Sequence, residues 1–284
     1  MPAISLVICL RDEFQLLDRL LRQTAGCYDE LVVVHDGLEN ELDAAHAADI
    51  VTERYSGHLF FRQREYQQEP HWPFAWSCTR HDWILRLDAD EIPSQELKNW
   101  LTRFREAEEP PASISGYTCI WPLWDGRRVI TRKWPAGRIF LLHKERVRFF
   151  GMVEQVPVPD VRFEPVSLIL DHRPARKSYG FRNLVLRQQA FRWRRVIARS
   201  LLGLPTDLRT WRWSTPEWPA IWESIRRSPL RTGLYRLIVW PIRTLRDMWR
   251  IEGRVVPSAA LFNGLHHFLI ALQYWRLRRS RARK

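Results

Sequence analysis

WILRLDADEIPS, residues 83–94, joins an apolar run directly to a group of acidic side chains. The run at 83–87 has the length and composition of a buried strand. Asp88, Asp90 and Glu91 follow at once, and carboxylates crowded in this way repel one another unless a cation neutralises them. In an extended backbone Asp88 and Asp90 point the same way, so both reach one ion, and Mg²⁺ often binds through one or two carboxylates. The alternative interpretation is an acidic, solvated turn.

The same stretch also predicts how the strand ends. Pro93 blocks further strand pairing because it has no N–H to donate. Ser94 is a preferred residue for capping a helix, which we expect over residues 95–104. The strand therefore ends at the acidic group, and a helix begins just beyond it.

Strands and helices alternate before this stretch. Buried strands are expected at 4–10 and 31–34, helices at 14–22 and 40–48, and short strands at 49–52 and 59–61. Alternation in units of about 25–30 residues predicts a mainly parallel α/β sheet flanked by helices. Ligands of such sheets lie beyond the carboxyl ends of the strands. Neither a G-x-G-x-x-G motif nor a P-loop follows the first strand.

The chain changes character after Pro110 and Pro111. Helical periodicity returns from Tyr179 onward, which divides the chain into an α/β domain at 1–178 and a helical extension at 179–284. Between these points, short β-branched and aromatic runs predict strands at 114–121, 128–133, 139–143, 147–150 and 167–170.

The net charge of +13 is unevenly distributed along the chain. Residues 176–284 carry 24 Lys and Arg against 5 Asp and Glu, a net charge of +19, whereas residues 1–175 carry 21 against 27, a net charge of −6. This asymmetry predicts an anionic partner for the second half, either nucleic acid or a membrane surface. Eight of the 15 Trp residues also lie in the basic part, and Trp with Arg favours the membrane interface.

Residues 255–275 form a stretch of 21 residues without formal charge, which is close to the length of a membrane span. Its polar residues, such as Asn263 and His266, disfavour a free-standing span. We expect an amphipathic helix in the membrane interface with the basic stretch 276–284 as an anchor, and a second amphipathic segment at 234–249. A single buried span is the alternative.

The four cysteines form no C-x-x-C pair and show no zinc-like spacing. Two of them lie in apolar strand-like runs, which favours free thiols in a reducing compartment. The first residues read as a strand that reaches an acidic pair by residue 13, not as a signal peptide. These features predict a cytoplasmic protein.

Three motifs, in their order and spacing, resemble glycosyltransferase family 2. They are ISLVICLRDE at 4–13, LVVVHDG at 31–37 and DWILRLDADE at 82–91, and looser matches follow at 138–140 and 151–154. The likeness is greatest to bacterial lipopolysaccharide-core members, which resemble β-glucosyltransferases acting on heptose. It is strong over residues 1–175 and loose beyond them. The resemblance implies a GT-A nucleotide-diphospho-sugar transferase fold with a membrane-associating helical extension.

The resemblance implies an inverting hexosyl transfer that depends on Mg²⁺ or Mn²⁺. Asp90 is the implied direct metal ligand, and Asp88 is expected to bind through water or to contact the donor. His172 resembles a histidine near the metal and the diphosphate. Glu154 matches the carboxylate that takes the proton of the acceptor hydroxyl. The alternative for Glu154 is a loop carboxylate paired with a nearby arginine.

Other positions match the donor and acceptor sites of the family. Asp36 matches the acid that reads the nucleoside base, with a turn-forming Asp-Gly pair as the alternative. Arg11 and Glu13 match the first-strand contact with the nucleoside, with helix capping as the alternative. The remaining candidates for contacts with the donor, the diphosphate or the acceptor are Arg62, Arg64, Arg138, Lys177 and Tyr179.

Two positions depart from the family pattern. Relatives carry Arg-Asn shortly before the D-W pair, where an arginine can meet the donor, whereas this chain has Trp72 and Pro73. Arg62 or Arg64 would then substitute. Val153 stands where relatives carry a histidine, so no role of that histidine is expected here.

The expected partners are a UDP- or GDP-sugar donor, a glycolipid or lipid-linked acceptor, and the anionic inner face of a bacterial cell membrane. A basic nucleic-acid-binding protein is the competing interpretation, but no nucleic-acid motif is recognised, so no nucleic acid is expected. A non-catalytic GT-A-like partner protein is the third interpretation. The presence of Asp88, Asp90 and Glu154 together argues against it.

Overall fold

The structure of the protein, a computed structural model, describes residues 1–41, 43–65, 68–124, 129–131, 137–149, 156–173, 188–203, 220–253 and 255–282. The chain forms two compact units. The sheet unit comprises the described residues of 1–122 and 137–173, and the helical unit comprises those of 123–131 and 188–282.

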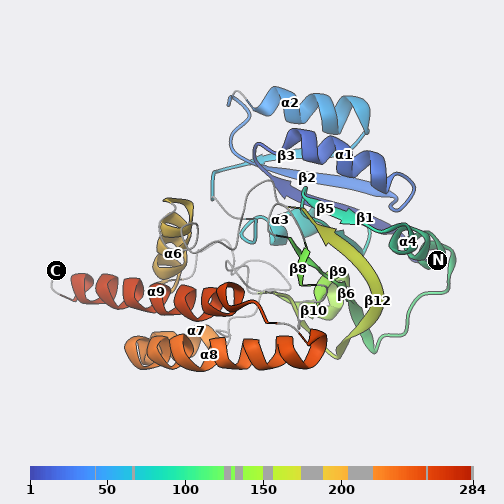
Figure 1. The fold of residues 1–284 in the computed structure, drawn as a ribbon. Coiled ribbons are helices and arrows are strands. Elements are labelled where there is room, and N and C mark those ends of the chain that lie inside the picture. The colour runs from blue at the N-terminus through green and yellow to red at the C-terminus, as the bar shows by residue number, and fades with distance from the viewer. Residues whose placement is uncertain are drawn as a thin grey trace. The chain divides into compact units, whose positions relative to one another are not determined.

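An eight-stranded sheet forms the centre of the sheet unit (Figure 1). Neighbours β3, β2, β1 and β4 run parallel, as do β6 and β12, whereas β9 and β5 run antiparallel to their neighbours. The predicted α/β class is confirmed, with a sheet that is mixed but mostly parallel. In spatial order the strands are β3 (His58–Arg62), β2 (Glu30–Asp36), β1 (Ile4–Leu10), β4 (Trp83–Arg86), β9 (Arg138–His143), β6 (Ile114–Ile120), β12 (Arg162–His172) and β5 (Glu91–Pro93).

Helices cover both faces of this sheet. Alternation along β1 sends Ile8 into a core shared with α1 and α4, and Val7 into a second core shared with α3. Each large apolar side chain that is fully buried in these cores contributes about 1.5–3 kcal/mol. The helices of the unit are α1 (Phe14–Thr24), α2 (Ala44–Ala48), α3 (Trp72–Ser77) and α4 (Gln95–Glu106), and the short ribbon β10 (Val147–Arg148) and β11 (Val158–Pro159) follows the 3₁₀ turn Lys144–Arg146.

Strand directions bring several chain segments to one edge of the sheet, which we call the carboxyl edge. The parallel strands β2, β1 and β4 end there at Asp36, Leu10 and Arg86. Because β9 is antiparallel to β4, it begins at the same edge with Arg138. Strand β12 runs in the direction of β6 and ends there with His172. Ligands of α/β sheets bind at this kind of edge.

Two expectations for local structure were wrong. Residues 49–52 do not form a strand but belong to the π-helical turn Asp49–Arg54, which continues α2. A short apolar run is compatible with either state, and its burial in the α1 side of the core decides the outcome. Pro93 does not prevent pairing, because β5 pairs with β12 as the last strand of the sheet, where a missing N–H is tolerated. The predicted cap is confirmed: Ser94 Oγ accepts from the Leu97 N–H at 3.2 Å.

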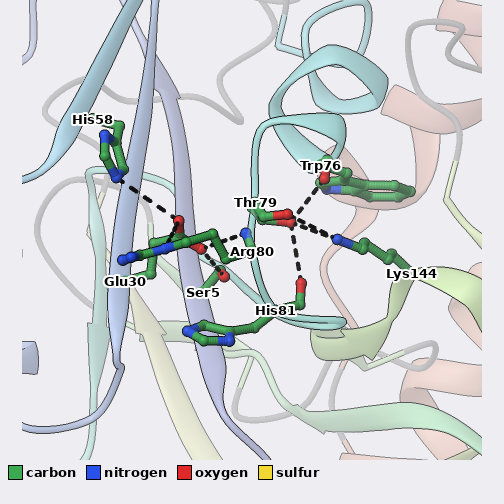
Figure 2. Close-up of polar contacts among 8 residues, drawn as sticks. All are labelled: Ser5, Glu30, His58, Trp76, Thr79, Arg80, His81 and Lys144. Carbon is green, nitrogen blue, oxygen red and sulfur yellow. Dashed lines mark hydrogen bonds and ion pairs between the residues drawn. The ribbon is translucent and has the colours of Figure 1, made fainter.

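Two polar networks hold the opposite, amino-terminal edge of the parallel strands (Figure 2). The carboxylate of Glu30, at the start of β2, accepts from Ser5 Oγ at 2.5 Å and from the backbone N–H and Nε of Arg80 at 2.9 and 3.0 Å. Lys144 Nζ donates to the carbonyl oxygen and the hydroxyl of Thr79, both at 3.0 Å. Glu30 and Lys144 therefore hold the loop that leads into β4 through Arg80 and Thr79. These contacts position the start of β4.

The helical unit consists of α6 (Gln188–Ser200), α7 (Ala220–Arg227), α8 (Pro229–Glu252) and α9 (Pro257–Arg281), with the two-stranded ribbon β7 (Leu123–Trp124) and β8 (Val129–Thr131). Helices α8 and α9 pack closely because glycines lie at their contact. A Cβ atom on Gly264 would lie 2.8 Å from the ring of Pro241, and one on Gly233 would lie 3.1 Å from Ala271.

Residues 255–275, expected in the membrane interface, contribute several side chains to the interior of this unit. Ile270 and Ala271 of α9 are fully buried, and His266 is 1% exposed. Arg194 of α6 donates from Nε to His266 Nδ1 at 3.1 Å. His266, one of the polar residues that disfavour a span, is thus part of a packed helical interior. Among the described residues, no helix combines the length and the apolar character that crossing a membrane requires.

Candidate active site

The acidic group after β4 lies in a tight turn at the carboxyl edge. Strand β4 ends at Arg86, and the Glu91 N–H donates back to the Asp88 carbonyl at 2.9 Å. The expectation that an extended backbone points Asp88 and Asp90 the same way is therefore wrong. Each carboxylate meets a different partner.

Asp88 belongs to a partly buried ion-pair network around Arg138. Arg138 Nη2 lies 2.7 Å from Asp88 Oδ2, and Arg138 Nε lies 2.9 Å from Glu91 Oε1. Glu91 is fully buried and also accepts from the Asp88 N–H at 2.8 Å and from Trp121 Nε1 at 2.9 Å. Burial raises the pKa of Glu91 against the opposing effect of Arg138. The pKa of Arg138 is raised, because the two carboxylates outweigh its burial.

Asp90 forms an ion pair with His172, the last residue of β12. Strand β5 pairs with the end of β12, with Glu91 opposite His172, and this pairing brings Asp90 Oδ2 to 3.3 Å from His172 Nε2. The ring of Trp121 stacks on His172 with 4.4 Å between the ring centroids. Burial alone would lower the pKa of His172, but the hydrogen bond and charge of Asp90 raise it above its usual value.

The donor atoms of Asp90 and His172 fit one divalent ion. Asp90 Oδ2 and His172 Nε2 would both be ligands of the ion, which would replace the contact they make with each other. Asp88 is engaged by Arg138 and does not join this pair. The described residues hold no group of three or more His, Cys, Asp or Glu that could bind a metal. Further ligands would come from phosphate or water, as is usual for Mg²⁺.

Arg86 is a cation of this edge that the sequence interpretation missed. Its side chain is buried, and the guanidinium carbon lies 3.8 Å from the ring centroid of Trp72. Neither Nε nor Nη1 donates a hydrogen bond to the described part of the chain. Burial, and then the charge of Arg138, lower the pKa of Arg86 to about 9. The sequence feature that could have identified Arg86 is that it is the one charged residue within the apolar run at 83–87.

The ends of β1 and β2 form a second polar group. Arg11 donates from Nη1 to the Asp36 carbonyl at 2.6 Å and pairs with Glu41. Asp36 Oδ1 lies 2.9 Å from His71 Nε2 and accepts from the Glu65 N–H at 2.6 Å. Because neighbouring strands are about 4.8 Å apart, the Asp36 end of this group and the turn after β4 lie roughly 10 Å apart along the edge.

The remaining predicted residues are placed more loosely. Glu13 is the N-cap residue of α1 but makes no side-chain capping bond. Arg62, at the end of β3, donates to the Pro70 carbonyl at 3.2 Å and lies over the ring of Phe74. Arg64 is exposed beyond β3. The predicted base Glu154 and the candidates Lys177 and Tyr179 lie outside the described residues.

Comparisons with known proteins leave the family open. No model of a known protein family matches the sequence. Mannosyl-3-phosphoglycerate synthase from Rubrobacter xylanophilus aligns over 77% of this chain and 79% of its own, with a TM-score of 0.46 and 15% identity. S. aureus TarS 1–349 in complex with UDP-GlcNAc aligns over 98% of this chain and 92% of its own, with a TM-score of 0.38 and 11% identity. In another S. aureus TarS structure, with a TM-score of 0.35 and 13% identity, this chain spans only 55% of the length of that chain. Likeness at this level establishes neither family nor activity.

Proposed function

We propose that this protein is a glycosyltransferase of the GT-A type that moves a sugar from a nucleotide donor to a hydroxyl acceptor. The observation that carries the proposal is the arrangement of the carboxyl edge. Asp90 and His172, whose side chains suit a metal ion, share this edge with the buried guanidinium of Arg86 and the partly buried guanidinium of Arg138, which suit phosphate. A sugar nucleotide needs both, because its diphosphate is the leaving group of the transfer.

The chain's own residues would bind the donor along this edge. The group around Asp36 and Arg11 would take the nucleoside, and the diphosphate would lie toward Arg86 and Arg138. The roughly 10 Å between the two groups leaves room for the ribose and the α-phosphate. Arg86 would serve as the donor arginine that is absent at Trp72, and it would supply charge in a place from which water is excluded.

Asp90 and His172 would hold the Mg²⁺ or Mn²⁺ ion. When bound, the ion would neutralise charge that develops on the departing diphosphate. Asp88 would remain in its ion pair with Arg138 and orient that guanidinium. Glu154 would accept the proton of the acceptor hydroxyl in an inverting, family 2-like reaction, and Lys177 and Tyr179 would contact the acceptor. The acceptor would be a glycolipid or lipid-linked glycan at the cytoplasmic face of a bacterial membrane.

A donor screen tests this proposal. Thermal shifts would be measured with UDP-, GDP- and CMP-sugars, beginning with UDP-GlcNAc, in the presence and absence of Mn²⁺ or Mg²⁺. We expect one donor class to stabilise the protein in a metal-dependent manner. In Asp90→Asn the metal-dependent part of the shift and the transfer activity should both be lost.

Asp160→Asn is the matched control. It makes the same chemical change in an ion-paired aspartate, Asp160 with Arg148 at 3.3 Å, next to the start of β12 and away from the carboxyl edge. This variant should respond to the donor like the wild type. Full transfer activity in Asp90→Asn, or no shift with any nucleotide sugar, would show that the proposal is wrong.

A further inference from the structure

Helix α8 carries a row of exposed apolar side chains on its outward face. Leu234, Tyr235, Ile238, Ile242 and Trp249 are each between 50% and 63% exposed. At about 100° per residue they fall within an arc of roughly 100° on the helix surface. Single exposed apolar residues are ordinary, but five of them on one side of a helix over about four turns mark a contact surface.

The side of α8 adjacent to this row already makes the packing contacts of the helix. Gly233 and Pro241 meet α9, and Met248 is 3% exposed. The exposed row is therefore not the side on which α8 joins the core of the helical unit. Membrane contact, which the sequence assigns mainly to 255–275, is better served by α8, because the large apolar side chains of α9 are mostly buried or partly buried, with Leu261 the exposed one among those described.

Arginines border the row on one side. Arg243, Arg246 and Arg250 are exposed and follow the apolar arc over about the next 60° of the helix surface. Trp and Tyr are the aromatic residues that suit the boundary between headgroups and acyl chains, and each juxtamembrane arginine adds attraction to anionic lipid. A second copy of the chain fits less well, because self-association through this row would bring the arginines of both copies together.

We propose that the outward face of α8 lies in the interface of an anionic lipid bilayer, with its apolar row inserted and its arginines at the phosphate level. This inference rests on the proposed function in one respect, the attachment to a membrane, and it names α8 as the attached element. It does not depend on the chemistry of the sheet unit. The helix would lie along the surface, since no described helix is suited to crossing it.

Vesicle flotation of the full chain tests the inference. Wild type should bind vesicles of phosphatidylcholine with phosphatidylglycerol and bind poorly to phosphatidylcholine alone. Ile238→Asn with Ile242→Asn should weaken the partition by about tenfold or more, which corresponds to about 1.4 kcal/mol. The matched control is Val156→Asn with Val161→Asn, two valines of the sheet unit that are 62% and 61% exposed, and it should bind like the wild type.

A charge series identifies the surface further. Replacing Arg243, Arg246 and Arg250 by glutamine should reduce binding to anionic vesicles more than replacing the α9 arginines at 276, 278 and 279. Equal binding by the Ile238/Ile242 variant and the wild type would overturn the inference. So would a wild-type dimer that this variant disrupts without any vesicle binding. Donor-induced thermal shifts should be unchanged in the variant, so failure here is distinguishable from failure of the proposed function.

Discussion

At the scale of single residues, Arg86 is the most informative side chain of the carboxyl edge. A buried guanidinium is costly unless it is fully paired, yet Nε and Nη1 of Arg86 donate no hydrogen bond to the described residues. Packing on Trp72 compensates only in part, as its pKa of about 9 indicates. The unfavourable burial of this charged group suggests that a negatively charged ligand binds next to it and pairs with the guanidinium.

We therefore expect Arg86→Met to separate stability from binding. Methionine packs against aromatic rings and removes the buried charge, so the melting temperature should stay the same or rise. Affinity for the nucleotide-sugar donor should fall by about tenfold or more, or about 1.4 kcal/mol, measured by titration calorimetry. Arg105→Met, which breaks an ion pair with Asp29 near the amino-terminal edge, is the control for loss of an arginine. A destabilised Arg86→Met with unchanged donor affinity would assign Arg86 a purely structural role.

The sequence predicted residues whose partners are close in the chain better than residues whose partners are distant. The Ser94 cap depends on a backbone group three residues away and is confirmed. The partners of Asp88 and Asp90 come from β9 and β12, and Arg138 lies 50 residues beyond Asp88. Strand order decides those pairs, and one sequence does not contain it. Trp121, which contacts both Glu91 and His172, was missed for the same reason.

At the scale of elements, hydrophobic runs predicted the central strands well because burial on both faces leaves an unbroken apolar signal. The strand expected at 4–10 is β1, and the core of β2 is likewise found where it was expected. Edge elements were less predictable. The short β5 exists only through its pairing with β12, and nothing local to residues 91–93 indicates it.

The amino-terminal edge should make stability sensitive to acid through Glu30. Burial would raise the pKa of Glu30, but hydrogen bonds from Ser5 and Arg80 lower it below its ordinary 4.5. A carboxyl group whose pKa is lower in the folded than in the unfolded state stabilises the fold above about pH 4.5. This stabilisation is lost as the pH falls through the folded-state pKa. Glu30→Gln should therefore melt below wild type at pH 7, and the difference should shrink toward pH 3.5. Thermal melts across this range, with the exposed Glu39→Gln as control, check the expectation; a constant difference would contradict it.

The contact between α8 and α9 should depend on Gly264. A Cβ atom there would lie 2.8 Å from the ring of Pro241 and 2.9 Å from the Arg236 carbonyl oxygen, so the helices must separate to accept alanine. We expect Gly264→Ala to destabilise the helical unit by about 1–3 kcal/mol, measured by urea unfolding. A Cβ atom on Gly203 would meet nothing within 4 Å, so Gly203→Ala is the matched control. An unchanged unfolding midpoint for Gly264→Ala would mean that the two helices do not meet at this point.

At the scale of the whole molecule, charge is divided unequally between the two parts of the chain. The first 175 residues carry a net charge of −6 and the rest +19. Composition alone predicted this division and the amphipathic character of the second part. Sequence patterns predicted amphipathic segments at both 255–275 and 234–249 and favoured the first for membrane contact, whereas the larger exposed apolar surface lies on α8. Only packing distinguishes a buried apolar helix from one that is free to meet a membrane.

This division predicts different salt sensitivities for the two binding events. Raising the salt concentration from about 0.1 M to about 1 M shortens the Debye length from about 10 Å to about 3 Å, which screens exposed arginines far more than buried ones. Binding of the wild type to anionic vesicles should therefore fall several-fold, because the arginines of α8 are exposed. Donor binding at the carboxyl edge should change much less, because Arg86 is buried and Arg138 largely so. Flotation and calorimetry on one preparation measure both quantities. Equal losses in the two assays would mean that one exposed basic surface binds both partners, against the separation of tasks argued here.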